Sequence, residues 1–281
     1  MHVSLDSALG RQRRLNSVGE SVLQIAPNAA AAYSLRSLTG GDPKVVRVRR
    51  DTDGGAGDND EQDFTASGIS SGALVAFVGS GNDGFVETWY DQSGNSEDAV
   101  QETAGSQPKI VNAGALLADG IDFDGSDDTL TAASVSGFGA TISMFAASVR
   151  DSGGAAVVSM GSSASTSNTN FGIIEGSSVS NVNARNTNSV TASASVSGVT
   201  RLTFGLTTGQ TSTKSGALGG TLVEDTSDYG SDFTSGELDT IFLGKLRSGS
   251  GSSFNGHIKE ALIYTSDQSS NRDAIEANIA N

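Results

Sequence analysis

One stretch constrains the fold more than any other: Phe85-Val-Glu-Thr-Trp-Tyr-Asp-Gln-Ser-Gly-Asn95, which contains the only tryptophan of the chain. Its first six residues are rich in β-branched and aromatic side chains, and this composition is typical of a pleated, largely buried strand. Asp91, Ser93, Gly94 and Asn95 then break the pattern, because such residues favour turns. We therefore predict a buried strand that runs into a tight loop.

The composition favours an all-β chain. The 281 residues include 36 glycines and only three prolines, and aromatic residues make up 6%. Long helical patterns are missing, so many short strands joined by small-residue turns are expected. The length suits one large sandwich with extensions. Because the chain has no cysteine, disulfides and thiolate metal sites are excluded.

Targeting signals are missing from the sequence. The first residues lack the basic start and the apolar run of about 7 to 15 residues that a secretory signal needs, and no apolar run approaches the roughly 18 residues of a membrane span. We expect a soluble protein that is not exported by the standard route. Membrane insertion is not expected.

The charge is distributed unevenly. The net charge is −15, yet residues 1–50 contain eight of the 17 basic side chains and only three acids. An acidic body argues against nucleic-acid binding, because phosphate contacts need clustered lysine and arginine. The basic front end is expected to meet an acidic partner.

We divide the chain into an attachment arm, residues 1–28, and a sandwich domain, residues 29–281. Leu15, Val18 and Val22 fall at helical spacing, although Gly10 and Gly19 weaken a helix there. A flexible leader is the alternative for this segment. The arm residues that carry its charge and apolar surface are Leu5, Leu9, Arg11, Arg13, Arg14, Leu15, Val18 and Val22.

Three helices and a series of strands are predicted within the domain. A helix is expected over residues 29–38, capped by Asn28, another after Ser71, and a closing helix within residues 266–281. Residues 44–50 alternate valine with arginine and predict a half-exposed strand with a basic outer face. Further strands are expected around residues 120–130, 140–149, 155–160, 170–174, 199–206, 216–223, 241–243 and 254–264, with polar-faced strands within 177–195.

Several of these segments resemble known families. Trp89-Tyr-Asp-Gln-Ser-Gly-Asn95 resembles the strand and loop of the catalytic module of α-L-arabinofuranosidase B, a concanavalin-like β-sandwich, and of uncharacterised phage proteins similar to it. Phe123-Asp-Gly-Ser-Asp-Asp128 and Phe254-Asn-Gly-His-Ile-Lys-Glu-Ala-Leu-Ile-Tyr264 are similar to laminin-G-like domains, in which the first forms a hairpin. The resemblance implies an all-β, concanavalin-like (laminin-G-like) antiparallel β-sandwich or jelly roll with a few short helices and an N-terminal arm.

Two acidic segments are candidate calcium sites. The loop of residues 51–63 has six carboxylates in thirteen residues, and calcium requires many oxygen ligands. Its spacing departs from the EF-hand, and a solvated loop is the simpler interpretation. Around residue 124, Asx-type bonding at a turn competes with calcium binding. The candidate ligands are Asp53, Asp58, Asp60, Asp122 and Asp124.

No catalytic pattern is complete in this sequence. Glycoside hydrolysis needs two carboxyl groups at a set separation, and the candidates on or beside strands, Glu87, Asp91, Glu175 and Glu260, read more simply as structural acids. The resemblance implies an acid/base aspartate after an Ile-Leu-Gly strand, but Phe242-Leu-Gly-Lys-Leu-Arg-Ser248 contains no acid. Neither His2 nor His257 lies in a nucleophile-elbow pattern. The chain is therefore expected not to be an enzyme.

The resemblance to phage proteins leads to the functional expectation. We expect a bacteriophage structural protein, made in the host cytoplasm and displayed on the virion surface as a capsid decoration, short fibre or spike, held by its arm to capsid or tail proteins and assembled as a homo-oligomer. The alternatives are an adhesin that binds a host-surface glycan and an arabinofuranosidase-like hydrolase. Tyr90, Asp91 and Asn95 form the candidate ligand loop, with Trp89 and Tyr229 as further sugar contacts.

Overall fold

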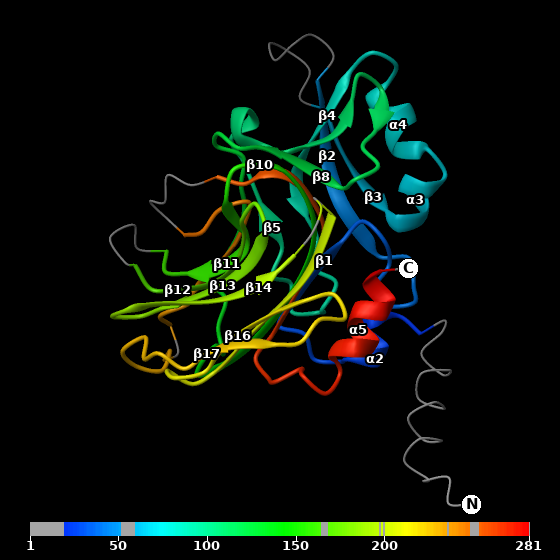
Figure 1. The fold of residues 1–281 in the computed structure, drawn as a ribbon. Helices are drawn as coiled ribbons and strands as arrows, with labels where there is room; N and C mark the ends of the chain where they lie inside the picture. Colours follow the sequence, from blue (N-terminus) through cyan, green and yellow to red (C-terminus); the bar gives the residue numbers. More distant parts are fainter. Residues whose placement is uncertain are drawn as a thin grey trace, which may run out of the picture.

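Strand β4 (Asp83–Trp89) lies where the two layers of the fold diverge (Figure 1). In the computed structural model, its first half pairs with β6 (Lys109–Asn112) and its second half pairs with β5 (Ala99–Val100). Strand β2 (Lys44–Asp51) occupies its other edge. The strand at the start of the Phe85–Asn95 stretch thus joins the two layers. The structure describes residues 20–51, 60–163, 168–196, 198, 200–234, 236–247 and 253–280.

The first layer is a long antiparallel sheet in the order β3-β2-β4-β6-β8-β19-β10-β15-β16-β17, with β7 beside β6 and β1 beside β19. Its remaining strands are β1 (Ala31–Ser34), β3 (Glu61–Thr65), β7 (Ala115–Leu116), β8 (Ile121–Asp124), β10 (Thr141–Ser152), β15 (Thr200–Thr208), β16 (Thr213–Ala217), β17 (Val223–Asp225) and β19 (Asn255–Tyr264).

The second layer continues from β5 in the order β5-β9-β18-β11-β12-β13-β14. Its strands are β9 (Leu130–Ala133), β11 (Ala155–Gly161), β12 (Asn170–Glu175), β13 (Val179–Arg185), β14 (Ser189–Ser195) and β18 (Thr240–Leu243). The two layers confirm the predicted all-β sandwich with a few short helices.

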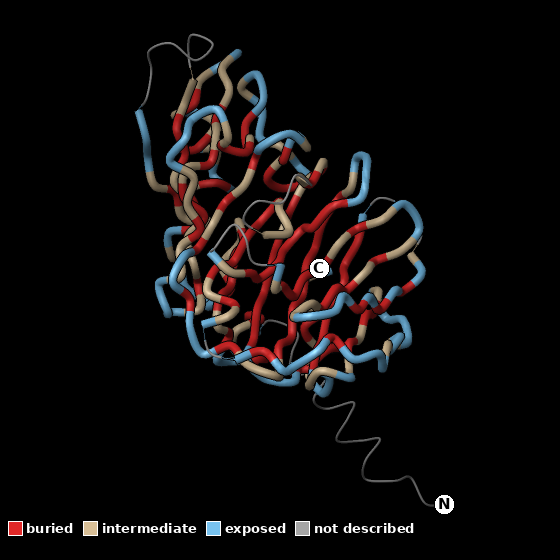
Figure 2. Tube along the Cα trace, turned by 90° about the vertical axis from the view of Figure 1, so that its left-hand side faces the viewer, coloured by how far each residue is buried: buried red, intermediate tan, exposed pale blue. Residues whose placement is uncertain are grey.

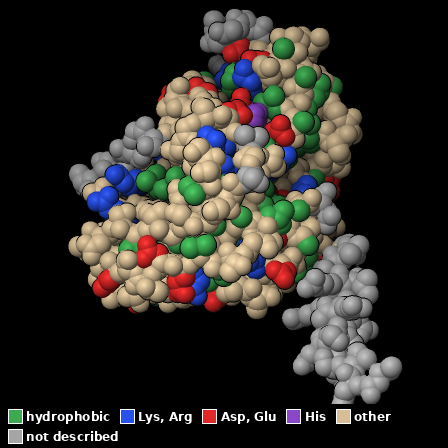
Figure 3. All heavy atoms as spheres, viewed as in Figure 1, with side chains coloured by type: hydrophobic (Ala, Val, Ile, Leu, Met, Phe, Trp, Pro, Cys, Tyr) green, Lys and Arg blue, Asp and Glu red, His purple; other side chains and the backbone are tan. Residues whose placement is uncertain are grey.

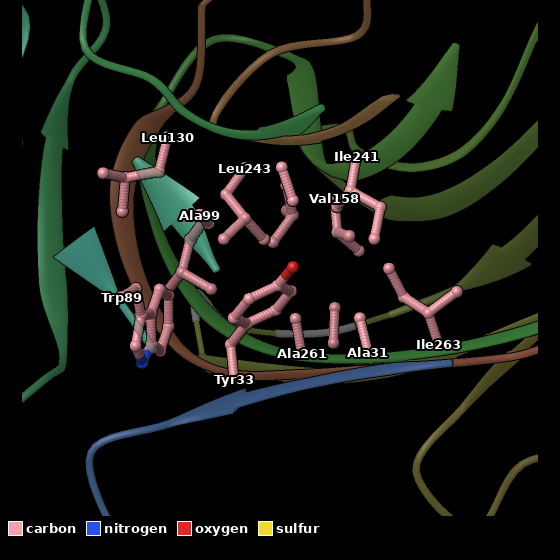
Figure 4. Packing of buried hydrophobic residues seen from close by; sticks show 14 of the residues in the cluster. Ala31, Tyr33, Trp89, Ala99, Leu130, Val158, Ile241, Leu243, Ala261 and Ile263 are labelled. Atoms are coloured by element: carbon pink, nitrogen blue, oxygen red, sulfur yellow. The ribbon is translucent and has the colours of Figure 1, made fainter. Parts of the chain in front are cut away.

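The main core lies between the two layers, where buried strands run through the centre of the molecule (Figure 2). Figure 4 shows Trp89 beside Tyr33 and Ala99, with Leu243, Val158 and Ile241 across the core from them. The Tyr33 and Trp89 rings pack at 5.9 Å between centroids. Burial of such side chains is the dominant favourable contribution to the free energy of folding.

A second, smaller core covers the outer face of the first layer. There α2 (Val22–Ile25) and α5 (Arg272–Ile279) pack side by side next to β1 (Figure 1). Val22 and Ile275 are fully buried against Phe145 and Leu262. Val22 and Ala26 therefore pack as part of the second core.

The predicted helix over residues 29–38 is wrong. Residues 31–34 form strand β1, whose partners on β19 are residues 260–263. Ala31 and Tyr33 face the main core and Ala32 faces the second core, so both faces of the strand are buried. This tertiary packing outweighs the helix propensity of an alanine run, which amounts to only tenths of a kcal/mol per residue.

The other helix predictions are confirmed. Helix α4 (Ala73–Val78) follows the short helix α3 (Ala66–Ser70), and it begins after Gly72 because that residue takes the left-handed conformation, with φ of 84°. The closing helix is α5. A single 3₁₀ turn, η1 (Ala104–Ser106), completes the helical elements of the described residues, and none of these is long and apolar enough to cross a bilayer.

The Phe123–Asp128 segment is not a hairpin. Strand β8 pairs with β19 in the first layer, whereas β9 pairs with β18 in the second, so this turn connects the two layers. The expected Asx-type bonding is present, because the Ser126 amide donates to Asp124 Oδ1 at 2.7 Å. The local turn chemistry was predictable, but the partners of its two strands were not.

The burial of Trp89 generates a test of the core. The side chain is fully buried and its Nε1 atom has no hydrogen-bond partner among the described residues, so we attribute its contribution to packing. We expect Trp89→Ala to lower the free energy of unfolding by about 3 to 5 kcal/mol. Trp89→Phe, which keeps a ring beside Tyr33, should lose much less. Urea unfolding followed by circular dichroism measures both, and equal losses would contradict packing as the cause.

Candidate functional site

The loop after β4 clamps strand β1. Asp91 accepts hydrogen bonds from the Ala32 amide at 2.8 Å, the Ser93 amide at 2.9 Å and the Glu97 amide at 3.2 Å. The Ser93 hydroxyl donates to the same carboxylate at 2.6 Å. Each oxygen of the Asp91 carboxylate therefore accepts two hydrogen bonds, and together these bonds hold the loop and the strand together.

Gln92 and Asn95 continue this clamp along the chain. The Gln92 amide nitrogen Nε2 donates to Ser34 O and Arg36 O, both at 3.0 Å, and its Oε1 accepts from the Leu38 amide at 2.8 Å. Asn95 Nδ2 donates to the carbonyls of residues 29 and 30 at 2.9 and 3.0 Å. Polar side chains of the loop thus replace a neighbouring strand.

The predicted ligand loop is therefore mainly structural. The Tyr90 hydroxyl donates to Asp63 Oδ1 at 2.7 Å, and burial together with this bond raises the pKa of Tyr90. Trp89 and Tyr229, the other expected sugar contacts, are buried, and Tyr229 stacks on Phe233 at 4.9 Å. Of the three residues of the candidate ligand loop, Asn95 is the one that lines a pocket.

That pocket has a volume of about 500 Å³ and opens beside the clamp. Four of its side chains, Asn28, Glu97, Ser136 and Thr265, make no hydrogen bond within the described residues and offer carboxylate, amide and hydroxyl groups. The volume falls in the usual range for small-molecule sites, about 300 to 1,000 Å³. The remaining lining residues are Ala29, Ala30, Ser93, Asn95, Gly137 and Phe138.

Glu97 gives the pocket its chemical character. Burial, followed by the nearby charges of Asp91 and Asp98, raises the pKa of the Glu97 carboxyl. A raised pKa keeps a larger fraction of the carboxyl protonated at a given pH, so the group has a proton to donate. Among the other groups named above, amide and hydroxyl groups can donate to and accept from ligand hydroxyls.

The basic strand is neutralised by its neighbours. Lys44 and Arg47 approach Asp63 at 2.6 and 3.2 Å, and Arg50 approaches Asp60 at 2.7 Å. Arg49, of which only 6% is exposed, donates to Gln107 at 2.8 Å. The expected basic outer face therefore forms cross-strand ion pairs within the domain, which leaves little net charge there for an acidic partner.

The candidate metal ligands fall into separate places. Asp53 and Asp58 lie outside the described residues, and Asp60 is paired with Arg50. Asp122 lies beside Asp151 and His257, while Asp124 lies beside Asp127 and Asp128. No sequence pattern marks Asp151 or His257 as neighbours of Asp122, because only strand pairing brings them together.

Of the arm residues, Val22 is buried in the second core, so it is a core residue and not part of an attachment surface. Leu5, Leu9, Arg11, Arg13, Arg14, Leu15 and Val18 lie outside the described residues.

Two of the acids considered for catalysis are buried and paired with arginine. Glu175 accepts from Arg201 Nη1, the Thr203 hydroxyl and the Ser180 hydroxyl at 2.8 to 2.9 Å, and no part of its side chain is exposed. Glu260 binds Arg36 at 2.8 Å, and its burial raises its pKa although Arg36 opposes the shift. Both acids are held inside the domain by their partners.

Comparison with solved structures finds a similar fold in several glycoside hydrolases. The chain is similar to an arabinofuranosidase complexed with arabinofuranosyl-α-1,2-xylobiose, with a TM-score of 0.63 and 14% identity over 93% of this chain. Two structures of a GH54 α-L-arabinofuranosidase, one a mutant soaked with 4-nitrophenyl α-L-arabinofuranoside and one soaked with a cyclic sulfate inhibitor, match over the same share with TM-scores of 0.65 and 0.64 at 12% and 13% identity. The match spans 64 to 65% of those chains. No family model and no curated protein sequence matches.

The expectation that the chain is not an enzyme is corrected by this comparison, because the structures that match 93% of its length are glycoside hydrolases. The missing acid after Gly244 concerns one family pattern only. Carboxylates elsewhere in the chain, such as Glu97, lie outside that pattern. At this level of identity the likeness shows a β-sandwich fold shared with glycosidases, since one fold supports many functions.

The carboxyl of Asp128 predicts a pH dependence of stability. It is 7% exposed, and burial, opposed by a hydrogen bond from the Asp124 amide, raises its pKa from 3.8 to about 6. The folded state therefore binds this proton more tightly than the unfolded state. Its contribution to stability is full below pH 4 and is lost as the pH rises through 6, at a cost of about 2 to 3 kcal/mol.

We expect Asp128→Asn to remove this pH-dependent loss. The free energy of unfolding of the variant should therefore fall less between pH 4 and pH 7 than that of the original chain. Urea unfolding of the variant and of the original chain at pH 4, 5, 6 and 7 measures the difference. Asp127→Asn on the same turn is the matched control. Parallel curves for the original chain and Asp128→Asn would show that Asp128 titrates normally.

Proposed function

We propose that the protein is a carbohydrate-binding β-sandwich that recognises a glycan in the pocket between the β1 clamp and residues 136–138. The observation that carries this proposal is a group of polar side chains around one pocket of about 500 Å³ that make no hydrogen bond within the described residues: Asn28, Glu97, Ser136 and Thr265. Sugar hydroxyls require such paired donors and acceptors. The arabinofuranosyl-xylobiose complex of a similarly folded protein supports a saccharide as the ligand class.

The pocket also explains which kind of sugar contact to expect. Phe138 is 3% exposed, so the recognition depends on hydrogen bonds and not on stacking against an aromatic ring. Glu97 adds a negative charge or, when protonated, a donor. A neutral, hydroxyl-rich saccharide fits this lining better than an acidic one, because an acidic sugar would meet Glu97, Asp91 and Asp98.

Binding is tested by NMR titration with arabinofuranosyl-xylobiose, xylobiose and neutral cell-surface oligosaccharides. We expect one of these to shift resonances of the pocket residues, and Glu97→Gln and Thr265→Ala each to weaken binding about 5- to 12-fold, since each lost hydrogen bond costs roughly 1 to 1.5 kcal/mol. Ser193→Ala, on the exposed face of β14, is the control. Unchanged affinity in both pocket variants would place the site elsewhere.

The same samples test turnover. If a shorter saccharide is released, Glu97 is the carboxyl whose raised pKa suits a general acid, and Glu97→Gln should then abolish release while the weakened binding is still measurable.

As a second proposal, the domain is displayed on a virion through the chain that precedes residue 20. The supporting observation is the fixed position of this end: α2 packs against α5, and the Asn278 amide group donates to Glu20 O at 2.8 Å. This helical pair covers the outer face of the first layer, so the outer face of the second layer points away from it. Resemblance of the loop to phage proteins supplies the context of a virion.

Deleting residues 1–19 tests this display. We expect the truncated chain to fold with an unchanged midpoint of thermal unfolding, because Val22 and the rest of the second core remain, but to be absent from particles. Incorporation is measured by the amount of the chain that co-sediments with virions, with the full chain as the reference. Equal incorporation of both forms would move the attachment surface onto the sandwich.

A further inference from the structure

Three neighbouring strands of the first layer bring two aspartates and a histidine together. Asp122 on β8 is the register partner of His257 on β19. Asp151 lies on β10, at a register shift between Arg150 and Ser152 where β10 has one residue more than β19. Such a bulge redirects a side chain out of the regular alternation. Figure 3, in which histidine is purple, shows acidic side chains in red around the imidazole at the surface.

Gly256 makes this arrangement possible. Its φ is 144°, and a Cβ atom there would lie 2.2 Å from Val149 O and 3.1 Å from the Asp151 amide nitrogen. A side chain at this position would push β10 away from β19. The glycine therefore allows the bulge to press against β19 and brings the Asp151 carboxylate beside His257.

The three groups surround one point but do not bond to one another. His257 Nε2 lies 3.9 Å from Asp122 Oδ1 and 3.7 Å from Asp151 Oδ2, which is beyond hydrogen-bond reach. The imidazole is only 16% exposed, yet neither of its nitrogens has a hydrogen-bond partner in the described chain, and Nδ1 is buried. Nε2 is the nitrogen that faces both carboxylates, and within the described residues it is available to an external partner.

The surrounding charges favour a cation. Asp151 and Asp124 place further negative charge beside Asp122. Lys109 also faces the cluster, but it is bound to Asp83 at 2.7 Å, and Lys259 is bound to Asp119 at 3.2 Å. Neither lysine is therefore placed to neutralise both carboxylates.

We propose that Asp122, Asp151 and His257 bind one divalent metal ion such as zinc. One imidazole nitrogen and two carboxylate oxygens form a donor set that suits zinc, manganese or iron(II). Ligand atoms about 2.0 to 2.2 Å from a tetrahedral ion are roughly 3.4 Å apart. The two distances from His257 Nε2, 3.9 and 3.7 Å, are close to this value, and all three ligand atoms lie within 4.8 Å of one another. Asp151 is 51% exposed, which leaves the solvent side open for water or a ligand oxygen.

Calorimetric titration of the purified full chain with zinc chloride tests this site. We expect saturable binding of one ion, and His257→Gln and Asp151→Asn each to weaken it at least about 10-fold, because even loss of an outer-shell partner costs about that much. His2→Gln is the matched control, since the chain has only two histidines. Asp127→Asn controls for the neighbouring acidic group.

A second readout does not depend on the stability of the variants. Cobalt(II) bound to the original chain should give visible absorption bands typical of a site with few ligands and should be displaced by zinc. Calcium should not displace it, because calcium requires about six to eight oxygen ligands. The proposal is overturned if His257→Gln, folded as judged by circular dichroism, binds zinc as well as His2→Gln does, or if zinc binding does not saturate.

Discussion

Strand β1 has a partner on one edge only, and the fold depends on how its other edge is satisfied. On one side β1 pairs with β19. On the other edge, the Ala32 amide donates a hydrogen bond to Asp91 and Ala32 O accepts one from the Gln92 backbone amide. The Gln92 side chain donates to Ser34 O and accepts from the Leu38 amide. An unpaired backbone group that is buried costs about 1 to 3 kcal/mol, so losing this set of bonds would release β1 and uncover both cores.

This constraint explains why the loop sequence is so specific. A carboxylate is needed at Asp91 because it accepts from three backbone amides at once, and an amide is needed at Gln92 because it must both donate and accept. Residues of this kind are usually read as ligand contacts when they follow a strand. Here their polar atoms are consumed by the fold, and the groups free to meet a ligand are those at the edge of the clamp, such as Glu97 and Thr265.

The sequence predicted the sandwich, most of its strands and the burial of Trp89, because alternation and turn residues report local structure directly. It did not predict β1, where an alanine run hid a strand that is buried on both faces, nor the crossing between layers after Phe123. Both depend on partners more than 100 residues away, such as β19 and β18. The sites could not be predicted for the same reason. Glu97 and Thr265, like Asp151 and His257, are far apart in the sequence and become neighbours only in the folded chain.

The pocket and the proposed metal site are independent parts of the molecule. Both involve strand β19, since His257 lies near its beginning and Thr265 follows its last residue. Eight residues of extended chain span about 26 Å, so an ion at one end does not contact a saccharide at the other. Any coupling between them would have to pass along β19 itself, whose central residues are packed between the main core and the second core. A rigid strand of this kind fixes the separation of the two sites, and each can be removed by substitution without disturbing the other.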